Sequence, residues 1–103
     1  MILEDDIDLD DTLADVLRAL GKLPASWEMI RLAGLRERQS QSLCQLTPQH
    51  TVERLLNTAG GTQGYALTPH GASKLLAAAR PIIRPIDIMV DRYWHNGVDI
   101  LAV

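Results

Sequence analysis

Two Thr-Pro pairs, Thr47-Pro48 and Thr68-Pro69, constrain the fold of this chain more than any other feature of its sequence. A threonine hydroxyl before a helix accepts a hydrogen bond from one of the first backbone N–H groups, and a proline at the first helical position has no N–H that needs a partner. Apolar residues follow each pair at helical spacing: Val52, Leu55, Leu56 and Ala59 after the first, and Ala72, Leu75, Leu76 and Ala79 after the second. The pairs therefore predict two capped helices, the first over residues 48–58.

The rest of the chain also shows mostly helical patterns. Thr12 precedes an apolar stripe that ends at Gly21, and further stripes predict helices within residues 27–35 and 86–94. The polar residues 36–45 are interpreted as a short helix, with a loop as the alternative. Residues 60–67 contain three glycines and end in Tyr-Ala-Leu, which predicts a short hairpin or an extended segment. The fold class predicted is mainly α, with five or six short helices and a minimal β-hairpin.

The length of 103 residues allows one domain and excludes a large doubly wound or barrel enzyme. No apolar run approaches the roughly 20 residues that a membrane span needs, so we expect no membrane partner. The first residues are acidic where a secretory signal is basic and then apolar, so the expected location is cytoplasmic. The single cysteine, Cys44, excludes an intrachain disulfide and is interpreted as a small core residue.

Charge is distributed unevenly along the chain. The first 15 residues carry seven acids and no base, whereas residues 16–86 carry nine bases and three acids, within a net charge of -3. Residues 1–11 are therefore separated as an acidic leader. This leader is interpreted as a solvated tail, as acids that favour the positive end of the first helix, or as an arm that masks the basic residues.

A polar face is left on the predicted helix 48–58 when its apolar stripe turns inward. Amide side chains pair with adenine edges and arginine pairs with guanine in a major groove that admits a helix. The residues predicted to read bases are Gln49, His50, Arg54 and Asn57, and those predicted to contact phosphates are Arg36, Arg38 and Lys74.

The order of motifs in residues 36–79 resembles the second half of a bacterial winged helix-turn-helix regulator. Leu46-Thr47-Pro48 leads into Thr51-Val52-Glu53-Arg54-Leu55-Leu56, and Tyr65-Ala66-Leu67-Thr68-Pro69 leads into the next helix. The resemblance implies a winged-helix-like domain over residues 12–80, with a wing shorter than is usual. It also implies a regulator of transcription that binds specific sequences of double-stranded DNA. The alternative is a protein-interaction adaptor on the same fold that does not bind DNA.

Residues 81–103 are predicted to form a C-terminal helix and tail that serve as a dimerisation element. The apolar stripe there predicts a homodimer interface of Met89, Val90, Tyr93 and Trp94. The alternative is a terminus folded over its own core.

The sequence shows no motif typical of catalysis, cofactor binding or metal binding. No nucleophile motif, phosphate loop or dinucleotide fingerprint is present, so we expect no enzyme and no cofactor. The spacing of Cys44, His50, His70 and His95 matches no compact zinc pattern, so no metal site is predicted.

Overall fold

A mixed β-sheet forms the centre of the molecule. The structure, a computed structural model, describes residues 1–24 and 26–103, and within them the chain forms six strands and four helices. In chain order these are β1 (Ile2–Leu3), α1 (Leu13–Leu20), β2 (Met29–Arg31), β3 (Ser40–Gln45), β4 (Thr51–Leu55), β5 (Gly64–Leu67), α2 (Pro69–Ala78), α3 (Ile86–Asp91), α4 (Tyr93–Asn96) and β6 (Ile100–Ala102).

The order of strands across the sheet is β1-β5-β2-β6-β4-β3. Strands β2 and β6 pair in parallel, with Ile30 beside Leu101, and the other neighbours are antiparallel. Strands β1, β2, β3 and β6 therefore run in one direction, and β4 and β5 run in the other. All three residues of β2 and all three of β6 are buried, as expected for central strands that are covered on both faces.

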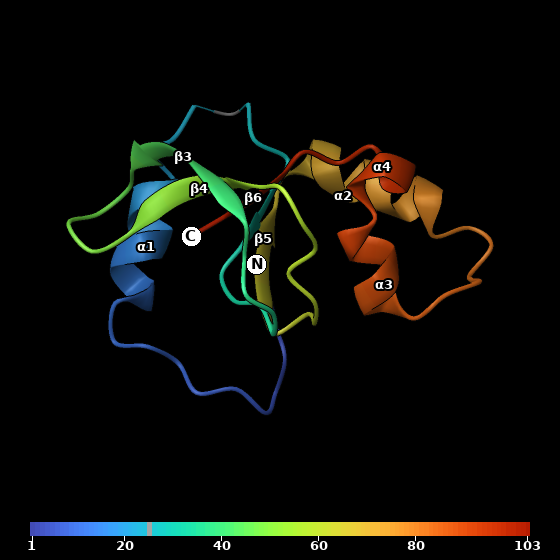
Figure 1. Ribbon diagram of the computed structural model, residues 1–103, viewed down its shortest axis with the longest axis horizontal. Coiled ribbons are helices and arrows are strands. Elements are labelled where there is room, and N and C mark those ends of the chain that lie inside the picture. The colour runs from blue at the N-terminus through green and yellow to red at the C-terminus, as the bar shows by residue number, and fades with distance from the viewer. Residues whose placement is uncertain (25) are drawn as a thin grey trace.

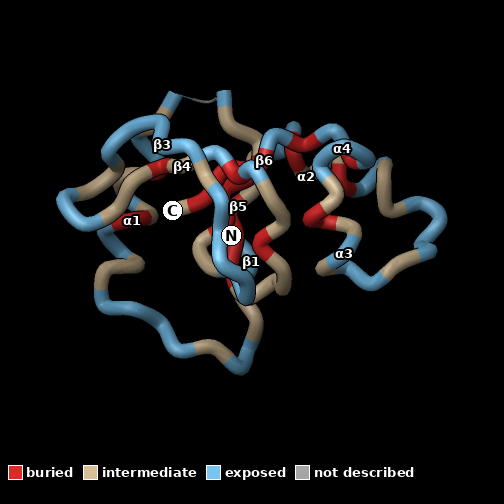
Figure 2. Tube along the Cα trace, in the orientation of Figure 1, coloured by how far each residue is buried: buried red, intermediate tan, exposed pale blue. Residues whose placement is uncertain are grey.

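Helices cover both faces of the sheet, with α1 on one side and α2, α3 and α4 on the other (Figure 1). Successive residues of a strand point to opposite faces, so Met29 joins the core under α2 and α3 while Ile30 joins the core under α1. Buried positions gather along the central strands and on the sides of the helices that face them (Figure 2). The molecule is thus a three-layer α/β/α arrangement with two cores.

Two of the predicted helices are confirmed. Helix α1 begins directly after Thr12, buries Val16 and Leu20 one turn apart, and is followed by Gly21. Helix α2 begins at Pro69, and the Thr68 hydroxyl accepts a hydrogen bond from the backbone N–H of Gly71 at 3.1 Å. The extended segment predicted at Tyr65-Ala66-Leu67 is also confirmed, as part of β5.

The predicted helix over residues 48–58 is wrong, because this segment forms a hairpin with the residues before it. Strands β3 and β4 pair antiparallel, and the turn between them contains the Thr47-Pro48 pair. The Thr47 hydroxyl accepts hydrogen bonds from the backbone N–H groups of Gln49 and His50 at 3.3 and 3.1 Å. The hydroxyl therefore caps a turn of the hairpin and not the first turn of a helix.

Three other predictions are wrong, namely the helices within residues 27–35 and 36–45 and the burial of Cys44. The polar segment 36–45, interpreted as a helix, contains β3, and the helix predicted within 27–35 is replaced by β2. The C-terminal tail supplies β6 in the middle of the sheet, and Cys44 is exposed on β3, not buried. The fold is consequently mixed α/β and neither mainly α nor winged-helix-like, because pairing between distant segments decides the structure of the polar and the short apolar stretches.

The apolar stripe of residues 86–94 forms two short helices. The backbone of Arg92, with φ -84° and ψ 63°, ends α3 and begins α4. The left-handed Gly97, with φ 69°, then ends α4 and directs the chain into β6. The interruption places the buried Asn96 against the end of α3, where its side-chain amide donates hydrogen bonds to the carbonyls of Met89 and Val90 at 2.9 and 3.0 Å.

A buried ion pair joins the sheet to α3. The Arg31 side chain is 1% exposed and donates hydrogen bonds to the Asp91 carboxylate and to the carbonyls of Gly60 and Gly61. The second oxygen of Asp91 accepts a hydrogen bond from the backbone N–H of Gly60 at 2.7 Å. Burial lowers the pKa of Arg31, and the Asp91 carboxylate opposes that shift. This cluster fixes α3 and the loop of Gly60 and Gly61 on the same side of the sheet.

Among the residues that the structure describes, no helix is both long enough and apolar enough to cross a membrane.

Candidate functional site

A cavity of about 450 Å³ opens at the carboxyl ends of three strands of the sheet. It lies where β1, β2 and β6 end and β5 begins, beside the segment that connects β1 to α1. Its lining residues are Leu3, Ile7, Asp8, Leu9, Asp10, Thr12, Leu13, Val16, Leu32, Ala33, His50, Gln63, Gly64 and Val103. Ligands of open α/β sheets bind outside the carboxyl ends of parallel strands, so this position is the expected one for a binding site.

The fold brings the walls of the cavity together from distant parts of the sequence. Leu3, Leu32 and Val103 stand at or just after the carboxyl ends of β1, β2 and β6, and Gly64 begins β5. At Gly64 an added Cβ would lie 3.0 Å from a methyl group of Leu3, so a glycine allows the close approach of β1. The floor is therefore apolar, and the polar groups come from the loops around it.

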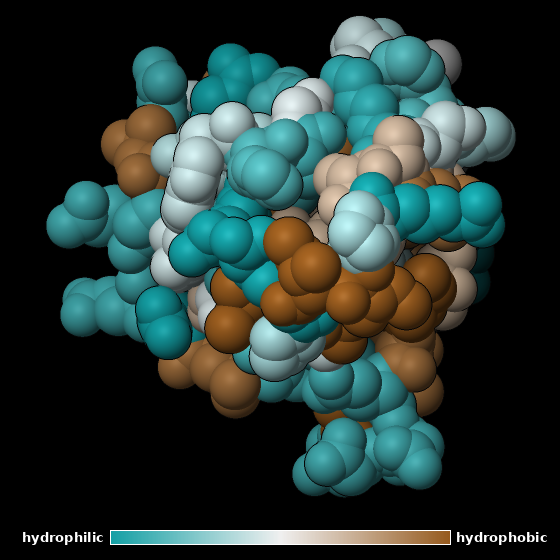
Figure 3. Space-filling model, turned by 90° about the vertical axis from the view of Figure 1, so that its right-hand side faces the viewer, coloured by the Kyte–Doolittle hydropathy of each residue, from teal (hydrophilic) through white to brown (hydrophobic). Residues whose placement is uncertain are grey.

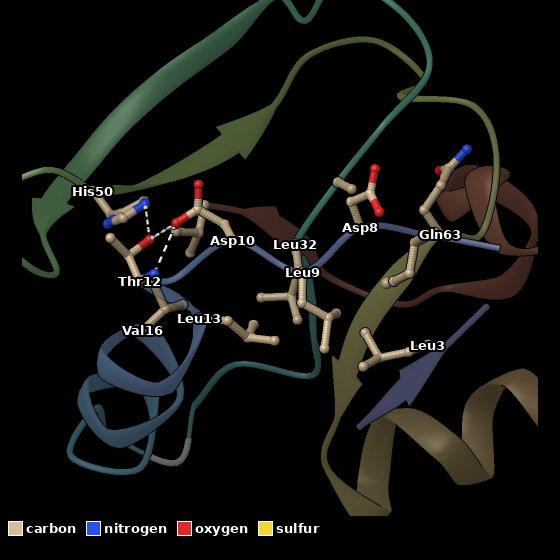
Figure 4. Close-up of a pocket in the computed structure, with 14 residues that line it drawn as sticks. Leu3, Asp8, Leu9, Asp10, Thr12, Leu13, Val16, Leu32, His50 and Gln63 are labelled. Carbon is tan, nitrogen blue, oxygen red and sulfur yellow. Dashed lines mark hydrogen bonds between the residues drawn. The ribbon is translucent and has the colours of Figure 1, made fainter. Parts of the chain in front are cut away.

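A chain of hydrogen bonds forms one side of the cavity (Figure 4). Oδ1 of Asp10 accepts from the backbone N–H of Thr12 at 2.8 Å and from the Thr12 hydroxyl at 2.5 Å. The Thr12 oxygen lies 3.4 Å from Nε2 of His50, and the Thr47 oxygen lies 2.8 Å from Nδ1 of the same ring. Because the Thr12 hydroxyl gives its only proton to Asp10, its oxygen accepts from the N–H of His50. The chain ties the acidic segment to the β3–β4 hairpin.

The two carboxylates in the cavity differ in their surroundings. The hydrogen bonds from Thr12, first from its hydroxyl and then from its backbone N–H, lower the pKa of Asp10. Asp8 lines the same cavity away from this hydrogen-bonded chain (Figure 4), and it receives no hydrogen bond from the residues that the structure describes. The Asp10 carboxylate is thus engaged within the chain, whereas the Asp8 carboxylate is exposed and has no partner among the described residues.

Gln63 contributes an unpaired polar atom next to the cavity. Its side-chain Oε1 is buried and has no hydrogen-bond partner within residues 1–24 and 26–103. A buried acceptor without a partner costs free energy unless a ligand or water supplies a donor. The side chain belongs to the loop between β4 and β5, whose Thr62 hydroxyl donates a hydrogen bond to the Glu4 carboxylate.

The four residues predicted to read DNA bases do not share one face. His50 lines the cavity, and Gln49 lies at the turn of the hairpin. Arg54 is on β4 and pairs with Asp99 at 3.0 Å, and the Asn57 side chain accepts a hydrogen bond from the backbone N–H of Gln39 at 2.9 Å. Only His50 of this set belongs to the cavity.

The residues predicted to contact phosphates are engaged within the chain. Arg36 lies 3.4 Å from the Thr58 hydroxyl, and Arg38 donates a hydrogen bond to the carbonyl of Val103 at 3.1 Å. Lys74 donates to the carboxylate of Glu28 at 2.6 Å.

The residues predicted to form a dimer interface divide between the core and the surface. Val90 is fully buried and Met89 packs against the same core. Tyr93 and Trp94 are exposed, and their rings meet edge to face with centroids 5.0 Å apart. The homodimer itself stays a prediction.

Sequence reasoning missed most of the cavity. Asp8, Asp10 and Thr12 were assigned to a leader and a helix cap, and Leu32 and Gln63 were not singled out at all. No sequence pattern marks the cavity, because Ile7, Asp8, Leu9 and Asp10 all line it although their apolar and acidic types alternate. Within the described part of the chain, no three His, Cys, Asp or Glu side chains are grouped to hold a metal ion.

Comparison with known proteins identifies the family. The model of a family described as glycosyltransferase family 25 (LPS biosynthesis protein) matches residues 1–90. The chain belongs to glycosyltransferase family 25. The match includes every residue that lines the cavity except Val103. No curated protein and no solved structure matches the chain.

Membership of glycosyltransferase family 25 overturns three expectations from the sequence. The resemblance to winged helix-turn-helix regulators is wrong. The two functions drawn from it, regulation of transcription by DNA binding and a protein-interaction adaptor, are wrong as well. The expectation of no enzyme is wrong as well, because the family is one of glycosyltransferases. The motifs misled because a Thr-Pro pair followed by apolar residues is compatible with a hairpin as well as with a helix.

Proposed function

We propose that this chain takes part in glycosyl transfer, moving a sugar from a nucleoside diphosphate donor to a hydroxyl group of a lipopolysaccharide saccharide. The observation that carries this proposal is the match to glycosyltransferase family 25 over residues 1–90. The cavity at the carboxyl ends of β1, β2 and β6 is the site at which we place the sugar.

The dimensions and lining of the cavity suit a sugar. Its volume of about 450 Å³ lies within the range of ligand pockets, which is roughly 300–1,000 Å³. Carboxylates accept hydrogen bonds from sugar hydroxyl groups, and apolar side chains pack against the C–H faces of the ring. Asp8 supplies a carboxylate acceptor in the cavity, and Leu3 and Leu32 supply apolar surface.

The transfer reaction needs a proton acceptor. The acceptor hydroxyl oxygen forms a bond to the anomeric carbon, and the bond from that carbon to the phosphate oxygen breaks and leaves its electron pair on the nucleoside diphosphate. The hydroxyl proton passes to a base. We assign this role to Asp8, because Asp10 already accepts two hydrogen bonds from Thr12.

Asp10, Thr12 and His50 are assigned a positioning role. Their hydrogen bonds connect the segment that carries Asp8 to the β3–β4 hairpin. Thr12 and His50, which make this contact, are 38 residues apart in the sequence. Without that connection the segment is held at its two ends only, and the Asp8 carboxylate loses its fixed place in the cavity.

A transfer assay tests the assignment. The full chain is incubated with radiolabelled UDP-, GDP- and ADP-sugars and with deacylated lipopolysaccharide oligosaccharide, and labelled oligosaccharide is counted. Asp8→Asn should lower the rate by about 10²–10⁴-fold, the usual contribution of a general base. Asp11→Asn is the matched control, since Asp11 is an exposed acid of the same segment that does not line the cavity. Absence of transfer from every donor, or equal loss in both variants, would contradict the proposal.

A further inference from the structure

An exposed apolar loop lies at the end of the molecule away from α1 (Figure 1). It comprises residues 80–85, between α2 and α3, together with Ile86, the first residue of α3, and is called loop 80–86 below. Ile82 is 88% exposed, Ile83 is 66% exposed and Ile86 is 54% exposed. Ile82 and Ile83 of the connection and Ile86 at the start of α3 line one groove and form an apolar patch, and such patches mark sites of interaction with another surface.

Cations surround the patch. Arg80 and Arg84 flank the two central isoleucines, and Arg92 lines the groove below them. None of these arginines forms an ion pair with a residue that the structure describes. Of the two carboxylates on α3, Asp91 is buried against Arg31, so Asp87 is the one that remains near the patch. The surroundings of the patch are therefore positively charged.

A groove of about 210 Å³ extends the patch between α2 and α3. Its walls are largely apolar and include Ala78, Ala79 and Met89 together with the three isoleucines, and Arg84, Arg92 and His95 also line it. The face shown in Figure 3 has hydrophobic side chains at its centre and hydrophilic side chains around them. Exposed apolar residues with neighbouring cations are the combination by which peripheral proteins lie on anionic bilayers.

We infer that loop 80–86 docks on the surface of a lipid bilayer that contains anionic lipids. Ile82 and Ile83 enter the boundary between headgroups and acyl chains, and Arg80 and Arg84 lie among the lipid phosphates. The sequence argued against a membrane partner because no apolar run is long enough to span a bilayer. Docking on its surface requires only an exposed apolar loop with neighbouring cations. This inference does not depend on the proposed glycosyl transfer.

Charge favours a bilayer over a second copy of the chain. In a two-fold dimer the same patch meets itself, so Arg80 and Arg84 of one copy would face the arginines of the other. The single free carboxylate nearby, Asp87, does not balance them. An anionic bilayer supplies the opposite charge directly.

Flotation with lipid vesicles tests the inference. The full chain is mixed with vesicles of phosphatidylcholine alone or with about 30% phosphatidylglycerol, a content that gives a negative surface potential. Binding should be strong only with phosphatidylglycerol and should weaken as salt rises. Arg80→Gln/Arg84→Gln should weaken it by about 30-fold, because each cation near the surface contributes about fivefold and the two factors multiply. Ile82→Ser/Ile83→Ser should weaken it by at least about tenfold.

Two matched variants serve as controls. Leu43→Ser removes an exposed leucine from β3, and Lys22→Gln removes an exposed cation that follows α1, so neither should change binding. Absence of binding to phosphatidylglycerol vesicles overturns the inference, as does binding that all four variants retain. A wild-type dimer that Ile82→Ser/Ile83→Ser converts to a monomer, without vesicle binding by either form, would identify a second copy as the occupant and would also overturn it.

Discussion

Asp91→Asn should strongly destabilise this protein, because Asp91 is the buried partner of Arg31. The change removes the charge that faces Arg31, whose side chain is 1% exposed. Breaking a buried ion pair by neutralising one partner costs about 3–5 kcal/mol, because the other charge stays buried without compensation. The remaining hydrogen bonds of Arg31 go to the neutral carbonyls of Ala33, Gly60 and Gly61, which do not replace the lost charge.

The loss is large against the whole stability of a small domain, which is about 5–15 kcal/mol. For a domain of about 100 residues, 1 kcal/mol shifts the midpoint of thermal unfolding by about 4 °C or more, so Tm should fall by about 12–20 °C. Circular dichroism at 222 nm during heating measures Tm, and urea unfolding at 25 °C measures the free energy of unfolding.

The chain offers a matched control in the exposed pair of Arg54 and Asp99. Its atoms lie 3.0 Å apart, but its side chains are 47% and 44% exposed. Water solvates both charges there, so Asp99→Asn should cost at most about 1 kcal/mol. Equal losses in Asp91→Asn and Asp99→Asn would refute the reasoning, since burial would then not determine the strength of the pair.

Two further predictions concern the contact between α2 and the start of β2. Gly71→Ala should destabilise the protein by about 1–3 kcal/mol, because a Cβ there would lie 2.3 Å from the carbonyl oxygen of Glu28. Urea unfolding measures the loss, and Ser73→Ala on the same helix is the control. The pKa of Glu28 is lowered from 4.5, first by the hydrogen bond from Lys74 and then by the hydrogen bond from the backbone N–H of Asp99. The contribution of Glu28 to stability is therefore present above about pH 4.5 and is lost as the pH falls through the lowered pKa. Urea unfolding between about pH 6 and pH 3 should therefore show a smaller acid dependence for Glu28→Gln than for the wild type, and equal slopes would contradict this assignment.

The elements that the sequence predicts correctly are those decided by neighbouring residues. Thr12 and Thr68 precede helices whose apolar stripes face the sheet, and these helices begin where the patterns indicate. In α2 the capping hydrogen bond from Gly71 to Thr68 lies within four residues of chain. Local patterns of this kind need no knowledge of the rest of the fold.

The elements that it predicts wrongly are decided by distant pairing. Val52 and Leu55 are three residues apart, a helical spacing, yet in β4 they point to opposite faces of a sheet that has a core on each side. Strand β6 lies between β2 and β4, about 70 residues from β2, and nothing near it in the sequence distinguishes a central strand from an apolar tail. A sheet covered on both faces removes the alternation that identifies strands.

The candidate site was hidden for the same reason. Its residues come from the ends of β1, β2 and β6 and from the loops around them, so no single motif contains them. His50 was identified as functional, although for DNA binding and on a helix that does not exist. The hydrogen-bonded chain from Asp10 through Thr12 to His50 becomes visible only when the hairpin folds toward α1.

Binding of a donor sugar to the cavity is the most direct test of the central claim. Backbone amide resonances of the 15N-labelled chain are followed while UDP-galactose or UDP-glucose is added to about 1 mM, a concentration that detects weak complexes. Shifts should concentrate at Asp8, Leu32, Gln63 and Gly64, and Asp8→Asn should weaken binding while Asp11→Asn leaves it unchanged. Shifts confined to the faces of α2, α3 and α4, or no shift with either sugar nucleotide, would contradict the assignment of this cavity as the sugar site.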